Sequence, residues 1–233
     1  MATSLPLILV PGLLCSARLY APQVTALWAR GAVMVADHRQ DAEIGAVARR
    51  ILDHAPPRFA LAGLSYGGYL AFAMMRIAPE RIERLALLDT SARPDTPEQK
   101  EAREKFIAIA QGGNLAEVVE TLAPRFVHHG RRRDEALMAT VREMAVETGT
   151  EAFVRQERAI MSRGDSRLLL GRIRCPTLVV VGDRDELTPP ELAKEIAEGI
   201  AGSRLVVVPE CGHLSTIEQP DAVNAAMIEW LAG

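Results

Sequence analysis

The chain has 233 residues, of which 48% are hydrophobic and 24% charged, so its composition excludes a disordered chain, a collagen-like chain and a coiled coil. Its 27 Lys and Arg against 30 Asp and Glu give a net charge of −3, which supplies no electrostatic reason to bind nucleic acid or an anionic membrane surface. At this length we expect one large domain, with a small-molecule substrate as its partner.

The cysteines and the N-terminal residues indicate a cytoplasmic protein. Three cysteines are scattered along the chain, which argues against a disulfide framework and for a reducing compartment. The first apolar run is interrupted by Pro11, and no Lys or Arg precedes Arg18, so the pattern of a secretory signal is missing. No window reaches the roughly 18 consecutive apolar residues of a membrane span. We expect no membrane association, and a monomer or a homodimer.

Short apolar runs of strand length recur along the chain, bounded by Gly, Pro or charged residues. They are nearly continuous rather than alternating, which is typical of strands covered on both faces. The runs are 7–10, 32–36, 59–63, 85–88, 177–181 and 205–208. Helical segments between them include one around Trp28, followed by 67–78, 190–200 and 221–232. This order predicts an α/β fold with a doubly wound, mostly or wholly parallel six-stranded sheet.

One connection, from Asp89 to Thr177, is far longer than a crossover requires. Its pattern is helical, with Thr96 as an N-cap and Gly112 just beyond the end of the first helix. The helices predicted here are 97–111, 115–126, 133–148 and 151–161. We therefore predict an α/β core over residues 1–92 and 166–233. The helical cap over residues 93–165 should emerge at the carboxyl edge of the sheet, where open α/β folds bind ligands.

A tight turn follows the third strand, with the sequence Gly63-Leu64-Ser65-Tyr66-Gly67-Gly68. This is G-x-S-x-G between a strand and a helix, and a Cβ at Gly63 or Gly67 would crowd the neighbouring backbone. The turn presents the Ser65 hydroxyl at a helix N-terminus, where free N–H groups favour developing negative charge. The alternative interpretation is a tight turn in which Ser65 only caps the helix.

Acidic side chains and a histidine follow two later strands. Asp183 and Asp185 come just after the fifth strand, and His213 comes just after the sixth. A serine hydroxyl needs a base within hydrogen-bond reach, and that base needs a carboxylate to fix its tautomer. The chain order Ser, Asp, His is expected when nucleophile, acid and base come from successive strand ends.

On these residues the chain resembles the α/β-hydrolase fold superfamily, particularly its bacterial members with a helical cap. The resemblance covers almost the whole chain and is strongest at the serine turn, at the Gly-x-x-Asp-x-x-x-Pro pattern of residues 182–189, and at residues 212–213. It implies Ser65 as the nucleophile, Asp185 as the acid and His213 as the base, with no cofactor and no metal.

Two features depart from the family pattern. Only six residues precede the first strand, so the usual antiparallel start should be missing, and Pro11 stands before Gly12 where the family commonly has His. The oxyanion hole survives this change because its donors are backbone N–H groups, here those of Leu13 and Tyr66.

Several other residues compete for a role. Asp89 is an alternative acid, and Asp183 is better interpreted as a loop-bracing carboxylate. Arg131-Arg132-Arg133 is a solvated helix start or, because it lies in the cap, an anionic-substrate site. Cys15 is a small apolar filler. Ordinary surface or helix-terminal positions are expected for His38, His54, His128 and His129.

The pattern as a whole predicts a cofactor-independent serine hydrolase, carboxylesterase-like, that cleaves an ester or related acyl bond. An alternative is a carbon–carbon bond hydrolase or lyase acting on a carboxylated metabolite. In a different class, a ligand receptor could retain the triad, and steady turnover of a p-nitrophenyl ester would separate the two classes. The fold does not specify the substrate.

The cap sequence also predicts the character of the pocket. With five Phe, three Tyr and two Trp in the chain, an aromatic cage is not expected. Apolar helix positions predict a methionine-lined pocket for short acyl groups of about C2 to C6. These positions are Phe106, Ile109, Leu122, Phe126, Met138, Met144, Phe153 and Met161.

Overall fold

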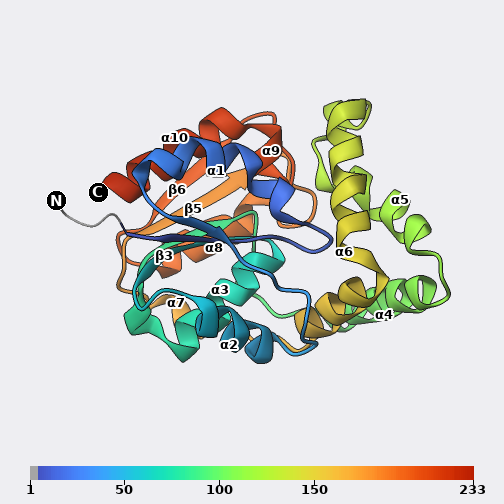
Figure 1. The fold of residues 1–233 in the computed structure, drawn as a ribbon, viewed down its shortest axis with the longest axis horizontal. Helices are drawn as coiled ribbons and strands as arrows, with labels where there is room; N and C mark the ends of the chain where they lie inside the picture. The colour runs from blue at the N-terminus through green and yellow to red at the C-terminus, as the bar shows by residue number, and fades with distance from the viewer. Residues whose placement is uncertain (1–4) are drawn as a thin grey trace.

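The computed structural model describes residues 5–233, which fold around one six-stranded sheet (Figure 1). The strands follow the order β2-β1-β3-β4-β5-β6, and every neighbouring pair is parallel. Their bounds are β1 (Leu7–Val10), β2 (Val33–Val35), β3 (Phe59–Leu64), β4 (Ile82–Leu88), β5 (Thr177–Gly182) and β6 (Arg204–Val208). The predicted wholly parallel sheet is confirmed over this part of the chain. Residues 1–4, which belong to the segment before the first strand, lie outside the described residues.

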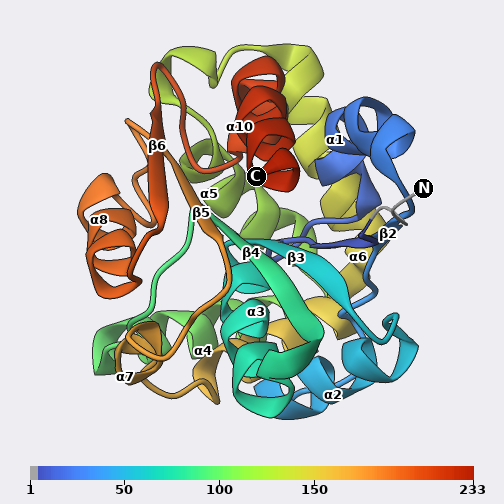
Figure 2. The ribbon, with the colours of Figure 1, turned by 90° about the vertical axis from the view of Figure 1, so that its left-hand side faces the viewer.

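Helices cover both faces of the sheet, which is why its strands are continuous apolar runs. The helices of these layers are α1 (Ala21–Leu27), α2 (Ile44–His54), α3 (Tyr66–Ile77), α8 (Pro190–Gly199), α9 (Ser215–Glu218) and α10 (Pro220–Ala232). In β1, Leu7 and Leu9 pack into one layer with α1 and α10, whereas Ile8 and Val10 pack into the opposite layer with α2, α3 and α8. Figure 2 shows α1 and α10 on one side of the strands and α2 and α3 on the other.

Helix α2 is not among the segments predicted above. It begins after Glu43, whose carboxylate accepts hydrogen bonds from the N–H groups of Gly45 and Ala46. Its buried positions recur at the spacing of one helix face, which is the signal that identifies it. These positions are Ile44, Val47, Ala48, Ile51 and Leu52.

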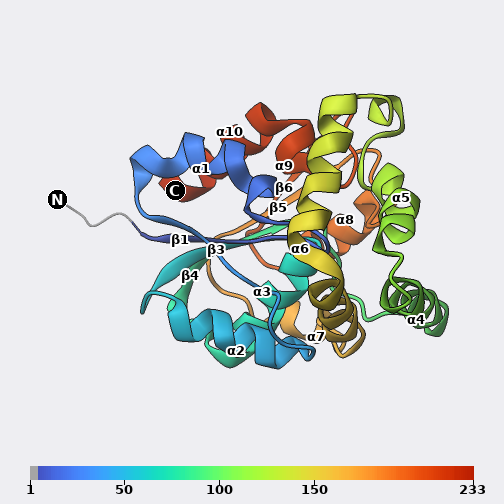
Figure 3. The ribbon, with the colours of Figure 1, turned by 45° about the vertical axis from the view of Figure 1, so that its right-hand side comes forward.

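The connection between β4 and β5 is helical, and most of it lies beside one end of the sheet (Figures 1 and 3). Its helices are α4 (Pro97–Gln111), α5 (Leu115–Phe126), α6 (Glu135–Met161) and α7 (Arg167–Leu170), and we call α4 to α6 the helical insertion. The two helices predicted over 133–161 form one element that bends at Gly149, where φ is 75°. Within residues 5–233, no helix is long and apolar enough to cross a membrane.

Candidate active site

Ser65 lies in the turn between β3 and α3, at the carboxyl edge of the sheet. Its φ of 55° and ψ of −115° form a strained conformation for a residue with a side chain. A Cβ on Gly67 would lie 1.9 Å from the carbonyl oxygen of Val10, and a Cβ on Gly63 would lie 2.2 Å from the carbonyl oxygen of Gly67. Both positions therefore require glycine, and this close backbone packing presents Ser65 at the edge of the sheet.

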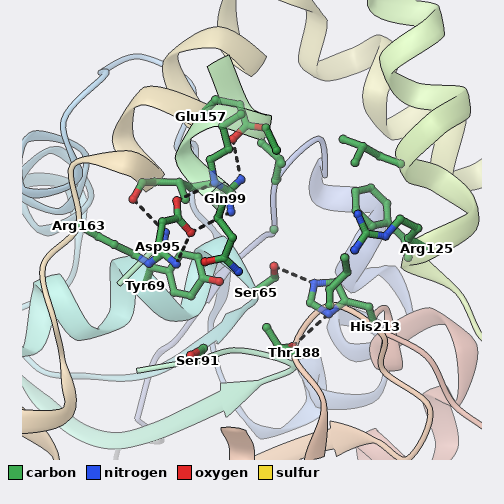
Figure 4. A pocket seen from close by; sticks show the side chains of 18 of the residues that line it. Ser65, Tyr69, Ser91, Asp95, Gln99, Arg125, Glu157, Arg163, Thr188 and His213 are labelled. Carbon is green, nitrogen blue, oxygen red and sulfur yellow. Dashed lines mark hydrogen bonds and ion pairs between the residues drawn. The ribbon is translucent and has the colours of Figure 1, made fainter. Parts of the chain in front are cut away.

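The structure brings Ser65, His213 and Asp185 together in one hydrogen-bonded row. Nε2 of His213 lies 2.8 Å from Oγ of Ser65, a contact marked by a dashed line in Figure 4, and Nδ1 of His213 lies 2.7 Å from Oδ2 of Asp185. Because a carboxylate accepts at Nδ1, that nitrogen carries the proton and Nε2 is left to accept from the serine hydroxyl. This arrangement can transfer a proton from serine to histidine.

The Asp185 carboxylate is itself held by three hydrogen bonds. Oδ1 accepts from the N–H groups of Leu187 and Thr188 at 2.8 and 2.9 Å, and Oδ2 accepts from the Thr188 hydroxyl at 2.7 Å. Burial raises the pKa of Asp185, but the charge of His213 and these hydrogen bonds bring it below its ordinary value. The acid is therefore kept ionised and oriented, and Thr188 is a contributor that the sequence analysis missed.

The pKa of His213 is raised above its ordinary value. Burial lowers this pKa, but the charge and hydrogen bond of Asp185, together with the charges of Asp89 and Glu218, raise it above that value. The side chain is only 3% exposed, so solvent screens this interaction weakly. His213 is therefore a stronger base than a free histidine.

The two other candidates for the acid, Asp89 and Asp183, form hydrogen bonds with groups other than His213. Oδ1 of the fully buried Asp89 accepts from the N–H of Gly182 at 3.0 Å, and its Oδ2 accepts from the Ser215 hydroxyl. Burial raises the pKa of Asp89 well above its usual range, and the nearby Asp185 raises it further. Asp183 accepts from the N–H of Cys211 at 3.1 Å, which braces the loop as predicted. Among the contacts within residues 5–233, the hydrogen bond to Nδ1 of His213 is made by Asp185 and not by either of these.

The predicted oxyanion donors lie on both sides of Ser65. Leu13 belongs to the loop after β1, which passes directly beside Ser65, since a Cβ on Gly12 would lie 3.4 Å from Cβ of Ser65. Tyr66 is the first residue of α3. Neither the Leu13 nor the Tyr66 N–H has an acceptor within the described part of the chain, so both can donate to a ligand.

A cavity of about 350 Å³ lies between this edge of the sheet and the helical insertion (Figure 4). Ser65 and His213 line it, and so does Cys15, which is 2% exposed. Its apolar lining includes Leu13, Phe106, Leu122, Phe126, Ile160 and Leu187. Its polar lining includes Ser91, Asp95, Gln99, Arg103, Glu157 and Arg163. The prediction of a methionine-lined pocket is wrong for residues 5–233, because no methionine lines this cavity: Met138 and Met144 are buried in the hydrophobic core and Met161 packs against it.

The polar side of the cavity contains a network of ion pairs. Arg103 pairs with Asp95 at 2.7 Å and with Glu157 at 2.6 Å, and Arg163 pairs with Asp95 at 2.8 Å. The carboxylate side chains are 1% exposed, and the Arg163 guanidinium lies 4.0 Å from the centre of the Tyr69 ring. Arg103 and Glu157 are 54 residues apart, so no local pattern in the sequence identifies the network.

The other residues that the sequence analysis weighed for a role, the arginine run and the histidines, do not line the cavity beside Ser65. Arg131 pairs with Asp134 and Arg132 pairs with Glu186, and none of the three consecutive arginines 131–133 lines the cavity, so this run is not an anionic site there. His38 is 2% exposed, so its prediction as an ordinary surface or helix-terminal residue is wrong. Within residues 5–233, no group of three His, Cys, Asp or Glu side chains could hold a metal ion.

Fold and site together define an α/β-hydrolase. The chain belongs to the alpha/beta hydrolase family, whose model matches residues 7–226. It is similar to a thermophilic esterase from Thermogutta terrifontis, solved with malate bound, with a TM-score of 0.93, 33% identity, and coverage of 99% of this chain and 90% of that one.

Two further proteins show the range of this similarity. The enol-lactonase from Burkholderia xenovorans has a TM-score of 0.88 and 27% identity, with coverage of 100% of this chain and 93% of that chain. A candidate carbamate hydrolase from Azorhizobium caulinodans is 29% identical over an alignment of 242 positions, gaps included, which covers 96% of this chain and 89% of the relative. The comparisons therefore establish a hydrolase family whose members are named for different acyl bonds.

Proposed function

We propose that this protein is a serine hydrolase that cleaves an ester or a related acyl bond of a small molecule. The observation that carries the proposal is the hydrogen-bonded row from Ser65 through His213 to Asp185, because it opens on a cavity with two unused N–H donors beside it. The relatives named as an esterase and an enol-lactonase support an ester or lactone carbonyl as the target.

The reaction runs through an acyl-enzyme. Oγ of Ser65 attacks the carbonyl carbon while its proton passes to Nε2 of His213, and the Leu13 and Tyr66 N–H groups stabilise the oxyanion. His213 then gives the proton to the departing alcohol, which leaves the acyl group bound to Ser65. Water attacks this ester, gives its proton to His213, and releases the acid as the serine regains its hydrogen. Asp185 holds the imidazole in the required tautomer throughout.

In this assignment, residues 1–92 and 166–233 form the catalytic core and residues 93–165 form a cap. Phe106 of α4, Leu122 of α5 and Glu157 of α6 all line the cavity, so each of the three helices contributes to the space above Ser65. A cap in this position shields the carbonyl from bulk water, which strengthens the electrostatic interactions of the site.

Covalent labelling tests the nucleophile. A fluorophosphonate probe should label the wild type and not Ser65→Ala, and this substitution should lower kcat for p-nitrophenyl butyrate by roughly 10⁴-fold or more. Ser91→Ala is the matched control, because Ser91 also lines the cavity and lies outside the hydrogen-bonded row. Labelling of Ser65→Ala would refute the assignment, and labelling without steady turnover would favour the ligand receptor over the enzyme.

A second candidate is a carbon–carbon bond hydrolase or lyase acting on a carboxylated metabolite, and Arg125 favours recognition of such a carboxylate. Among the arginines that line the cavity, Arg93, Arg103 and Arg163 are paired with carboxylates, whereas Arg125 has no such partner within residues 5–233. Figure 4 shows Arg125 near His213, across the cavity from Arg163. A substrate carboxylate would pair with Arg125 without displacing an existing ion pair. The malate in the related esterase is consistent with this chemistry.

A pair of substrates tests this preference. Monomethyl glutarate carries a carboxylate, whereas dimethyl glutarate does not, and the proposal expects a higher kcat/KM for the monoester. Arg125→Gln should lower kcat/KM for the monoester about fivefold and leave the diester unchanged. Arg133→Gln removes the same charge from an exposed position that does not line the cavity, so it should alter neither. An equal loss for both esters in Arg125→Gln would exclude carboxylate recognition.

A further inference from the structure

The loop that carries Leu13 is held by a buried chain of hydrogen bonds that reaches into the helical insertion. The N–H of Leu14 donates to Oε1 of Gln156 at 3.1 Å, Nε2 of Gln156 lies 3.3 Å from Nδ1 of His38, and Nε2 of His38 lies 3.2 Å from the carbonyl oxygen of Gly12. Gln156 is 0% exposed and His38 is 2% exposed, so water does not compete for these contacts.

Each group in this series of hydrogen bonds can be assigned as a donor or an acceptor. The Gly12 oxygen can only accept, so Nε2 of His38 carries a proton and donates it. Burial lowers the pKa of His38 to about 4, so its ring is neutral near pH 7 and Nδ1 is an acceptor. Gln156 therefore donates through Nε2 and accepts the Leu14 N–H at Oε1. The chain of donors and acceptors has one direction and leaves no group unpaired.

The position of these contacts matters for the oxyanion hole. The Gly12 carbonyl and the Leu13 N–H belong to the same trans peptide group, in which they point in opposite directions. His38 anchors that carbonyl, and the N–H of Cys15 also donates to it at 3.2 Å. Anchoring the oxygen fixes the direction of the Leu13 N–H. Gln156 holds the next N–H, at Leu14, whose φ of 57° is uncommon for a residue with a side chain.

His38 also contacts the side chain of the residue that supplies the second predicted donor. The His38 ring packs beside the Tyr66 ring with 5.3 Å between their centres, and Tyr66 supplies the other predicted N–H. Neither Gln156 nor His38 lines the cavity, so neither is placed to touch a substrate. Gln156 is followed in α6 by Glu157, which lines the cavity and pairs with Arg103. One helix of the insertion thus contacts both the substrate space and the oxyanion loop.

We propose that Gln156 and His38 are positioning residues that set the orientation of the Leu13 N–H, so that docking of the helical insertion on the core is coupled to transition-state stabilisation. The inference rests on the proposed function, because the oxyanion hole has a meaning only for acyl transfer. It assigns to the insertion a part in catalysis beyond covering the cavity.

The substitution Gln156→Met tests the proposal, because it keeps the length of the side chain and removes both hydrogen bonds. We expect kcat for p-nitrophenyl butyrate to fall about 10- to 100-fold while KM changes less than threefold, since a misdirected donor weakens transition-state binding. The inhibition constant of a trifluoromethyl ketone, which forms a tetrahedral adduct, should rise by the factor by which kcat/KM falls. A rise in KM alone would overturn the proposal.

Arg155→Gln is the matched control. Nε of Arg155 donates to the carbonyl oxygen of Arg39 at 2.7 Å, so this substitution removes another contact between α6 and the core without touching the oxyanion loop. Its kcat should stay within twofold of the wild type. An equal loss in Arg155→Gln would show a general effect of insertion docking and would overturn a specific role for Gln156.

His38, on the other side of the hydrogen-bond chain from Leu14, supplies a second variant. His38→Ala should reproduce the loss in kcat, and the double variant with Gln156→Met should be no slower than the slower single variant, because both break one chain. If the losses in kcat of the two single variants multiplied in the double variant, Gln156 and His38 would act independently, and the proposal would be contradicted. Hydrogen exchange of the peptide that contains residues 11–15 needs no turnover, and should quicken in Gln156→Met but not in Arg155→Gln. Unchanged exchange overturns the inference even if Ser65-dependent hydrolysis, and with it the proposed function, is absent.

Discussion

The carboxyl edge of the sheet and the helical insertion contribute to one site by different physical means. At the sheet edge, backbone packing decides the geometry, as at Gly67, where a Cβ would lie 1.9 Å from the carbonyl oxygen of Val10. In the insertion, side chains decide it, as where Arg103 bridges Asp95 and Glu157. The tight glycine turn at the end of a strand is visible in the local sequence, whereas contacts between distant side chains are not.

His213 shows where the two regions meet. The N–H groups of His213 and Leu214 donate to the carbonyl oxygen of Phe126 at 3.1 and 3.0 Å, at the end of α5. The centres of the Phe126 and His213 rings also lie 6.2 Å apart. The candidate base therefore comes from a loop after β6 but is held in place by the insertion.

Among the substitutions that compare these two regions, the largest effect should come from the predicted acid at the sheet edge. Asp185→Asn should lower kcat about 10⁴-fold, because an amide cannot fix the tautomer of His213 or stabilise its charged form. Asp89→Asn should have a much smaller effect on kcat, since Asp89 bonds to Gly182 and Ser215 instead. Steady-state kinetics with p-nitrophenyl butyrate measure both. A larger loss in Asp89→Asn would reverse the assignment of the acid.

The next effect should be on stability and should come from the insertion. Arg103→Met leaves the carboxylate of Glu157 buried without its partner and should lower the free energy of unfolding by about 3 to 5 kcal/mol. Lys105→Met, on the same helix, breaks a pair with side chains 71% and 68% exposed and should change it by less than about 1 kcal/mol. Urea denaturation followed by circular dichroism measures both. Equal values would mean that the network does not stabilise the docked insertion.

The pH dependence should report on the junction at His213. Only neutral His213 can accept the serine proton, so kcat/KM should fall about tenfold per pH unit as the pH drops below the pKa of His213. Asp185 helps to raise that pKa above 6.5, so the midpoint of this fall in kcat/KM, the acidic limb of the profile, should lie above pH 6.5. In Asp185→Asn the raising charge is lost, and the limb should move to lower pH. A limb that stays in place would indicate that another group controls activity.

The smallest effect concerns the length of the acyl group of the substrate. A cavity of about 350 Å³ with a polar side favours short acyl groups, so p-nitrophenyl esters of about C2 to C6 should have the highest kcat/KM. Phe106→Ala would enlarge the cavity from the insertion side and should shift the maximum by a few carbons. A maximum at C12 or beyond in the wild type would contradict a small pocket and indicate a flap that opens widely.

The sequence by itself determined the sheet and the three residues brought together at its edge. The apolar runs identified all six strands, and the serine turn, the acid of residues 182–189 and His213 were found because each follows a strand within a few residues. Parallel strands end at the same edge, so side chains that follow them are brought close by the fold itself. A local pattern was therefore enough to predict that a serine, an acid and a histidine meet at this edge, and the resemblance to the α/β-hydrolase family assigned these places to Ser65, Asp185 and His213.

Only the tertiary structure decided what surrounds those residues. The sequence analysis placed His38 on the surface and methionines in the pocket, and both predictions were wrong. The structure buries His38 between Gly12 and Gln156 and lines one side of the cavity with charged groups. Helix periodicity shows which residues share a face but not which distant face they meet, and a hydrogen bond between residues 118 positions apart, as between His38 and Gln156, leaves no local pattern.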